Sequence, residues 1–168
     1  TENILSSLAL ALGFKGQPTQ ITNTPIIVYN NPSESTSIHL NKDENFIQFS
    51  LDLLTKSPQE AQYQPEPLTK ISQDTLALLT NNLQLPTSLS ITKNSTHYQT
   101  TNGPRFVTTT QDKAKYVKST YNYSLNSLPI FYPEGNSIET IHTLSGKPVE
   151  FDINLPPSSL KLLNTLNV

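Results

Sequence analysis

The amino-acid sequence predicts an α+β protein in which antiparallel sheets carry helices packed on one face, arranged as two helix-plus-meander modules. Apolar residues recur at helical spacing in two segments, residues 2–12 and 68–83. Each of these segments is followed by short runs of β-branched and aromatic residues separated by turn-forming residues. A chain of 168 residues suits one ordinary domain or two small ones, and its length allows folding without a disulfide or a structural metal.

The first third of the chain is predicted to be a helix followed by a three-stranded meander. The helix presents one apolar face, formed by Ile4, Leu5, Leu8, Ala11 and Leu12. Gly13 stands where a left-handed C-terminal cap is favoured, and Phe14 can close that cap with a hydrophobic contact. The strands are predicted at residues 26–29, 37–40 and 46–51, between turns rich in Asn, Pro and Asp.

Residues 57–67 are the strongest candidate for an internal boundary, because they contain Pro58, Pro65 and Pro67 and few aliphatic residues. This boundary divides a small module, residues 1–56, from a larger module, residues 68–168. The second predicted helix, residues 68–83, begins just after Pro67, and proline is well tolerated near the first turn of a helix.

The remainder of the larger module is predicted to be mainly extended. The predicted strand segments are residues 89–91, Tyr98, 106–107, 117–125, 130–132, 138–144 and 149–153. Ser145 and Gly146 form a predicted hairpin turn between the last two. A short final helix is predicted at residues 158–166, behind Pro156 and Pro157.

The composition favours an exported protein. Ser, Thr and Asn account for 55 of the 168 residues, whereas only 24 residues are charged. The surfaces of cytosolic proteins are usually rich in Lys and Glu, so a surface of hydroxyls and amides favours an extracytoplasmic location. The chain begins at Thr1 and contains no Met, and we therefore expect that a segment upstream, including any membrane anchor, lies outside it.

Several classes of chemistry are disfavoured by what the sequence lacks. The absence of Cys excludes thiolate catalysis and Cys-based zinc sites. A net charge of −2 with a single arginine, Arg105, disfavours nucleic-acid binding. There is no nucleophile elbow and no glycine-rich phosphate loop. We therefore expect no catalytic residue, no cofactor and no enzymatic activity.

Metal sites are not predicted either. His39, His97 and His142 do not stand at metal-ligand spacing, and Asp43 with Glu44 lies in a predicted turn that lacks the pattern of a calcium loop. Glu150 and Asp152 would share one face of a strand, where such acids usually serve solubility.

An aromatic group in the larger module provides the candidate binding residues. Its members are Tyr116, Tyr121, Tyr123, Phe131 and Tyr132. Tyrosine combines a broad contact area with a polar tip, as binding surfaces require. The alternative is that these side chains are half-buried strand residues on a sheet with one covered face. Under the binding interpretation, a partner would contact the second module.

The closing segments of the chain resemble the last strands of PepSY-type domains, as found in extracytoplasmic regulators of the YycH/YycI kind. The resemblance covers the Leu128-Pro129-Ile130-Phe131 run, residues 138–144, the Ser145-Gly146 turn and residues 149–153. In the rest of the chain, only the order of helices and strands is similar to that of PepSY-type domains. It implies a role in binding or inhibiting partner proteins at the outer surface of a bacterial membrane, without catalytic residues.

Three functional hypotheses follow. The first is a non-catalytic, extracytoplasmic protein-interaction or regulatory module of a secreted or membrane-anchored bacterial protein, binding a protein partner at the cell surface. The second is a structural subunit of a surface fibre or adhesin that self-associates through exposed strand edges. The third is an accessory hydrolase domain. None involves nucleic acid, and contact with a membrane is expected only through an anchor outside this chain.

Overall fold

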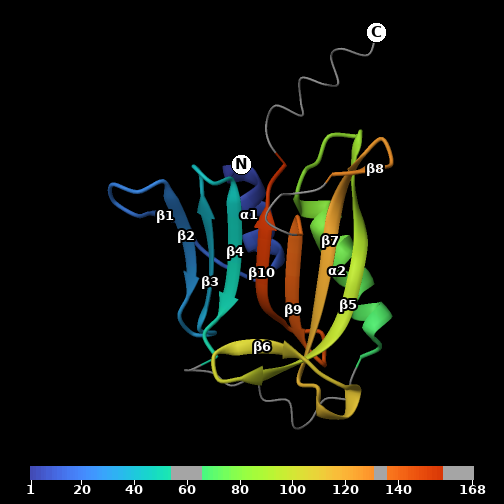
Figure 1. The fold of residues 1–168 in the computed structure, drawn as a ribbon. Coiled ribbons are helices and arrows are strands. Elements are labelled where there is room, and N and C mark those ends of the chain that lie inside the picture. Colours follow the sequence, from blue (N-terminus) through green and yellow to red (C-terminus); the bar gives the residue numbers. More distant parts are fainter. Residues whose placement is uncertain (54–65, 131–135, 157–168) are drawn as a thin grey trace.

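The computed structural model describes residues 1–53, 66–130 and 136–156, and it confirms the α+β class (Figure 1). The helices are α1 (Glu2–Ala11), α2 (Leu68–Asn82) and the 3-10 turn η1 (Gln111–Lys113). The strands are β1 (Thr19–Gln20), β2 (Ile26–Asn31), β3 (Thr36–Asn41), β4 (Phe46–Leu51), β5 (Leu89–Asn102), β6 (Arg105–Thr108), β7 (Tyr116–Leu125), β8 (Leu128–Pro129), β9 (Ile138–Thr143) and β10 (Pro148–Asn154). The predicted helix at residues 158–166 lies outside the described residues.

The strands form one mostly meandering antiparallel sheet. Its order is β1-β2-β3-β4-β10-β9-β7-β5-β6, and β8 pairs with β7 beside this path. The two predicted modules meet where β4 pairs with β10, through five register pairs from Glu150↔Ser50 to Asn154↔Phe46. The description of the chain as two separate modules is therefore not confirmed, because both halves contribute to the same sheet.

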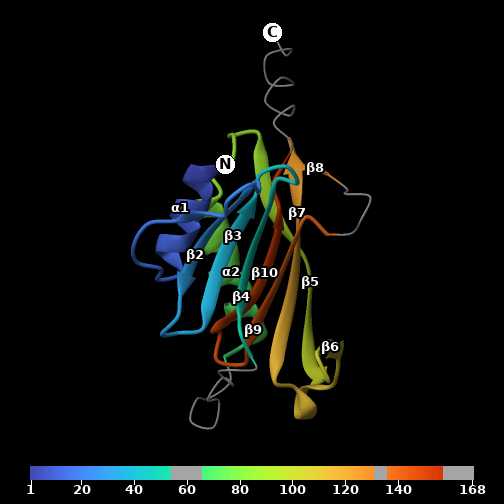
Figure 2. The ribbon, with the colours of Figure 1, turned by 90° about the vertical axis from the view of Figure 1, so that its left-hand side faces the viewer.

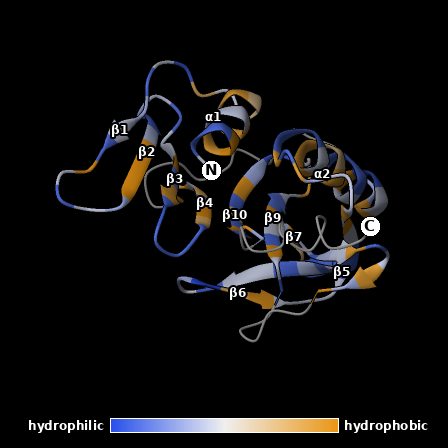
Figure 3. Ribbon diagram, turned by 90° about the horizontal axis from the view of Figure 1, so that it is seen from above, coloured by the Kyte–Doolittle hydropathy of each residue, from blue (hydrophilic) through white to orange (hydrophobic). Residues whose placement is uncertain are grey.

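The two helices lie on one side of the sheet, and the end of the β5–β6 hairpin bends toward the other side (Figures 2 and 3). The main core lies between the helices and the sheet. It combines side chains from both halves, including Leu5 and Leu8 of α1, Leu79 of α2, Ile47 of β4 and Phe151 of β10. This shared core is the reason that we expect the two halves to fold together.

Helix α1 ends as its sequence predicts. Gly13 adopts a φ of +86°, and the backbone N–H of Phe14 donates to the carbonyl of Ala9 over 2.9 Å. This six-to-one bond is the signature of a Schellman cap, and it turns Phe14 into the core. There the Phe14 ring makes edge contacts with Tyr29 and Phe49. The buried residues of α1 are Leu5, Leu8 and Ala9. The predicted apolar face included Ala11 and not Ala9, and it was wrong at Ala11, which is exposed.

Helix α2 rests on the sheet through polar contacts as well as apolar ones. The Tyr121 hydroxyl donates to the Ser72 carbonyl over 3.1 Å, and Thr75 Oγ1 lies 3.1 Å from His142 Nε2. The Thr75 hydroxyl itself donates to the Ile71 carbonyl over 2.8 Å. A Thr75 hydroxyl that donates to Ile71 accepts from His142, an arrangement that corresponds to the tautomer with the imidazole proton on Nε2.

His142 should make the protein sensitive to acid. The residue is 4% exposed, and burial lowers the pKa of its imidazole from 6.5 to about 4. Between these two values the unfolded chain takes up a proton that the folded imidazole does not. The resulting stability is fully present above pH 6.5 and is lost as the pH falls toward 4, by about 3 kcal/mol in total.

The measurement is the free energy of unfolding against pH for the wild type and for His142→Phe. His39 also has a lowered pKa and titrates in the same sense, so the difference between the two curves isolates His142. The variant curve should be flatter between pH 6.5 and 4. Parallel curves for the wild type and for His142→Phe would contradict the lowered pKa of His142.

Candidate interaction surface

The structure places the predicted binding tyrosines in the core, which corrects the expectation of an exposed aromatic surface. Tyr121 and Tyr123 are 0% exposed and belong to the main core, and Tyr116 is buried in a second, smaller cluster. Phe131 and Tyr132 lie outside the described residues. The alternative interpretation, half-buried strand residues on a sheet with one covered face, agrees with their place in a strand, but the three tyrosines are buried more completely than it expected.

The face of the sheet opposite the helices carries polar side chains instead. We call it the open face. Register pairs connect one row of residues across it from β2 to β5. The row consists of Val28, His39, Gln48, Asp152, Glu139, Thr120 and Ser95. Because side chains of directly paired residues share a face, this row is a continuous stripe across seven strands.

Hydrogen bonds organise the centre of the stripe. Gln48 Nε2 donates to Asp152 Oδ1 over 2.8 Å, joining β4 to β10. Lys118 Nζ lies 2.5 Å from Glu139 Oε2, and Asn136 Nδ2 donates to Glu139 Oε1 over 2.8 Å. Both carboxylates are thereby held in defined positions.

The stripe and its neighbour Glu150 concentrate negative charge. Asp152 and Glu139 are direct register partners, and like charges in that arrangement repel. Burial raises the pKa of Glu150, and the nearby Asp152 and Glu139 raise it further, against the opposing effect of Lys118. Burial alone would raise the pKa of Glu139 too, but hydrogen bonds from Lys118 and Asn136 leave it lowered. Three carboxylates thus gather around one lysine.

His39 adds no charge near neutral pH. Burial lowers the pKa of this half-buried imidazole, and the neighbouring Asp152 only partly offsets that effect. The centre of the open face is therefore net negative.

One end of the open face is covered by the β5–β6 hairpin. Phe106 of β6 packs against Tyr116 in a T-shaped contact with ring centroids 5.1 Å apart. These rings join Leu53, Ile141 and Val149 in the smaller apolar cluster. The row through Gln48 and Asp152 lies beyond this cluster, and all of its members except the buried Thr120 are partly exposed.

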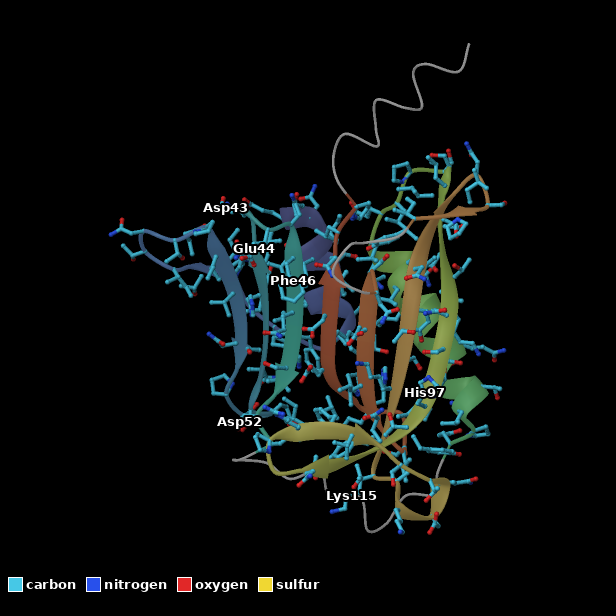
Figure 4. The ribbon with its side chains drawn as sticks, in the orientation of Figure 1. Asp43, Glu44, Phe46, Asp52, His97 and Lys115 are labelled. Carbon is cyan, nitrogen blue, oxygen red and sulfur yellow. The ribbon has the colours of Figure 1, made fainter. Side chains whose placement is uncertain are left out.

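The remaining candidate groups are dispersed. Asp43 and Glu44 are exposed at the turn between β3 and β4, and His97 lies on β5, far across the sheet (Figure 4). Within residues 1–53, 66–130 and 136–156, no three His, Asp or Glu side chains gather as a metal site would require.

The sequence indicates that Glu150 and Asp152 share one face of a strand, but it does not reveal which side chains surround them. Gln48, Lys118 and Glu139 come from strands that only the tertiary pairing brings alongside β10. Period-two alternation of polar residues in residues 46–51 and 149–153 was the available signal.

None of the described helices is long and apolar enough to span a bilayer. No protein-family model, curated protein or solved structure matches the chain.

Proposed function

We propose that the chain is a non-catalytic, extracytoplasmic interaction module that binds a partner protein on its open face. The observation that carries the proposal is the ordered stripe across seven strands, polar at every position except Val28, in which His39, Gln48, Asp152 and Glu139 remain partly exposed. A sheet face that served only solubility would not require carboxylates fixed by cross-strand hydrogen bonds. The stripe uses both halves of the chain, so the proposed surface extends beyond the second module that the tyrosines indicated.

The charge of the stripe indicates the kind of partner. Glu139, Glu150 and Asp152 outnumber the single Lys118, so a partner segment carrying Lys or Arg would relieve the repulsion among them. Complementary charge of this kind favours specificity and rapid encounter.

The edges of the sheet favour this module over a fibre subunit. At one edge β1 has two residues, and at the other β6 has four. The adjoining part of β5 contains a bulge between Lys93 and Ser95, and Lys93 is exposed there. Because β6 pairs only with residues 99–102 of β5, the edge along residues 89–98 is longer, and there the bulge and the charge of Lys93 oppose strand-to-strand association.

The order of elements supports a tandem arrangement, as the resemblance to PepSY-type regulators implies. A helix followed by antiparallel strands occurs as α1 with β2–β4 and again as α2 with β5, β7, β9 and β10. The last strand of each set pairs with the other in antiparallel fashion. We propose that two helix-plus-meander modules are fused into one sheet at this junction.

The charge of Glu150 should matter more to binding than to folding. Glu150→Gln removes one of the mutually repelling carboxylates, so thermal unfolding should be unchanged or improved, within about 1 kcal/mol. Attachment of the partner should weaken. The matched variant Lys118→Gln should have the opposite effects. It should lower stability because it removes the partner of Glu139, and it should not weaken attachment because it leaves the open face more negative.

Identification of the partner can use a photo-crosslinking residue at position 48, in the centre of the open face, within the full chain in its native cell. Position 10, on the exposed side of α1, is the control because Leu10 is 76% exposed and faces away from the sheet. A defined adduct at position 48, absent at position 10 and reduced by Glu150→Gln, is expected. Equal adducts at both positions, or an adduct that Glu150→Gln does not reduce, would reject the open face as the binding surface.

A further inference from the structure

The turn that joins β5 to β6 contains the one Asn-Gly dipeptide of the sequence, Asn102-Gly103. Asn102 is the last residue of β5 and pairs in register with Arg105, so only Gly103 and Pro104 form the turn. Gly103 has a φ of +60°, which glycine adopts without a steric penalty. Asn102 and Gly103 are both exposed. The turn therefore presents a side-chain amide to solvent beside a backbone nitrogen that no side chain shields.

The two groups are also unrestrained. No hydrogen bond links the Asn102 side chain or the Gly103 N–H to another residue that the structure describes. Apart from the two chain neighbours of Gly103, no atom lies within 4 Å of the position that a Cβ would occupy there. The Asn102 side chain is thus free to turn its Cγ toward the Gly103 nitrogen.

From this arrangement we infer that Asn102 is a site of spontaneous deamidation. Hydroxide removes the proton of the exposed Gly103 N–H, and the resulting anionic nitrogen is the nucleophile. It forms a bond to Asn102 Cγ, the bond from Cγ to the amide nitrogen breaks, and that nitrogen takes a proton from water and leaves as ammonia. The product is a five-membered succinimide. Water then opens this ring at either carbonyl, which gives aspartate or isoaspartate at position 102.

Three other asparagines precede a serine, the next least hindered neighbour after glycine in this chain. Two of them are restrained by their side-chain amides. Asn94 Nδ2 donates to Asn136 Oδ1 over 3.2 Å, and Asn136 Nδ2 donates to Glu139 Oε1 over 2.8 Å. The third, Asn126, is exposed, but the serine side chain that follows it crowds the attacking nitrogen. We therefore expect each of these asparagines to react more slowly than the one in the β5–β6 turn.

The reaction would change the charge and the geometry of the hairpin. An aspartate at position 102 stands directly opposite Arg105, and opposite charges in that arrangement stabilise a strand pair. Isoaspartate instead lengthens the main chain by one carbon atom, which disturbs the register between β5 and β6. Either product makes the chain more negative by one charge. This inference does not depend on the function proposed for the open face.

The test incubates the full folded chain in mildly alkaline buffer and follows deamidation by tryptic peptide mapping with tandem mass spectrometry. Cleavage after Lys93 and Arg105 releases residues 94–105, so Asn94 and Asn102 are compared within one peptide. A sample digested before incubation gives the baseline. In the folded chain, Asn102 should be converted about tenfold or more faster than Asn94. Both aspartate and isoaspartate should form at position 102.

The same incubation in concentrated urea separates the effect of the fold from that of the sequence. Unfolding should accelerate Asn94, because its bond to Asn136 is lost, whereas the Asn102 rate should change less than about threefold. Asn102→Gln should abolish conversion in the turn, and Asn126→Gln should leave the Asn102 rate unchanged. An unmodified Asn102, equal rates at Asn94 and Asn102 in the folded chain, or an Asn102 rate that rises about tenfold on unfolding would each overturn the inference.

Discussion

Leu8→Asp should lower the free energy of unfolding by about 3 kcal/mol or more. Leu8 is 0% exposed and packs in the core that α1 forms against the sheet. A carboxylate at this position would lose its hydration without gaining a partner, and the leucine contacts would be lost as well. Chemical denaturation monitored by circular dichroism measures the change.

The matched control is Leu10→Asp, which places the same side chain on the same helix, two residues further on. Leu10 is 76% exposed, so its replacement should change stability by less than about 0.5 kcal/mol. Ser7, which the helical pattern alone would suggest as the control, is unsuitable because its hydroxyl donates to Asn82 Oδ1 over 2.7 Å. Similar losses in Leu8→Asp and Leu10→Asp would show that the buried face of α1 is assigned wrongly.

The second large effect is expected from Tyr121 and Tyr123. Both rings are fully buried, so each truncation to alanine should cost about 3 to 5 kcal/mol, and the double variant should lose most of the stability of an ordinary domain. Thermal unfolding of the single and double variants measures this loss. A stable double variant that no longer binds its partner would instead restore the tyrosines as surface residues.

Tyr121→Phe separates the ring from its hydroxyl. It keeps the buried ring and removes the donor to the Ser72 carbonyl, so it should cost only about 1 kcal/mol. A loss as large as that of Tyr121→Ala would mean that the bond to α2, and not the packing of the ring, dominates at this position.

Local signals in the sequence were sufficient for most helices and strands. The Gly13-Phe14 pair predicted the end of α1, and runs of β-branched and aromatic residues between turn-forming residues predicted β2, β3, β4, β9 and β10. The Ser145-Gly146 turn is confirmed, with the Gly146 N–H donating to the Thr143 carbonyl. These features depend on residues close in the chain, and their physical causes can therefore be found in a short window.

The long strand β5 is a case that short sequence windows do not predict. Only its start at residues 89–91 and the single position Tyr98 were predicted, because the rest of the strand is almost entirely polar. The segment is extended because it pairs with β7, and the register shift between Lys93 and Ser95 interrupts its alternation. Pairing with a distant strand overrides a weak local preference.

The sequence by itself determined that this is a cysteine-free α+β chain with a hydroxyl- and amide-rich composition and two helix-then-strand halves. The tertiary structure decided that β4 and β10 join the halves, that Tyr121 and Tyr123 lie beneath α2, and that Gln48, Asp152 and Glu139 form one stripe. A tyrosine at alternating spacing is compatible with either face of a sheet, since period two identifies which residues share a face but not which face is covered. That choice depends on where the helices pack, which involves contacts between residues far apart in the chain.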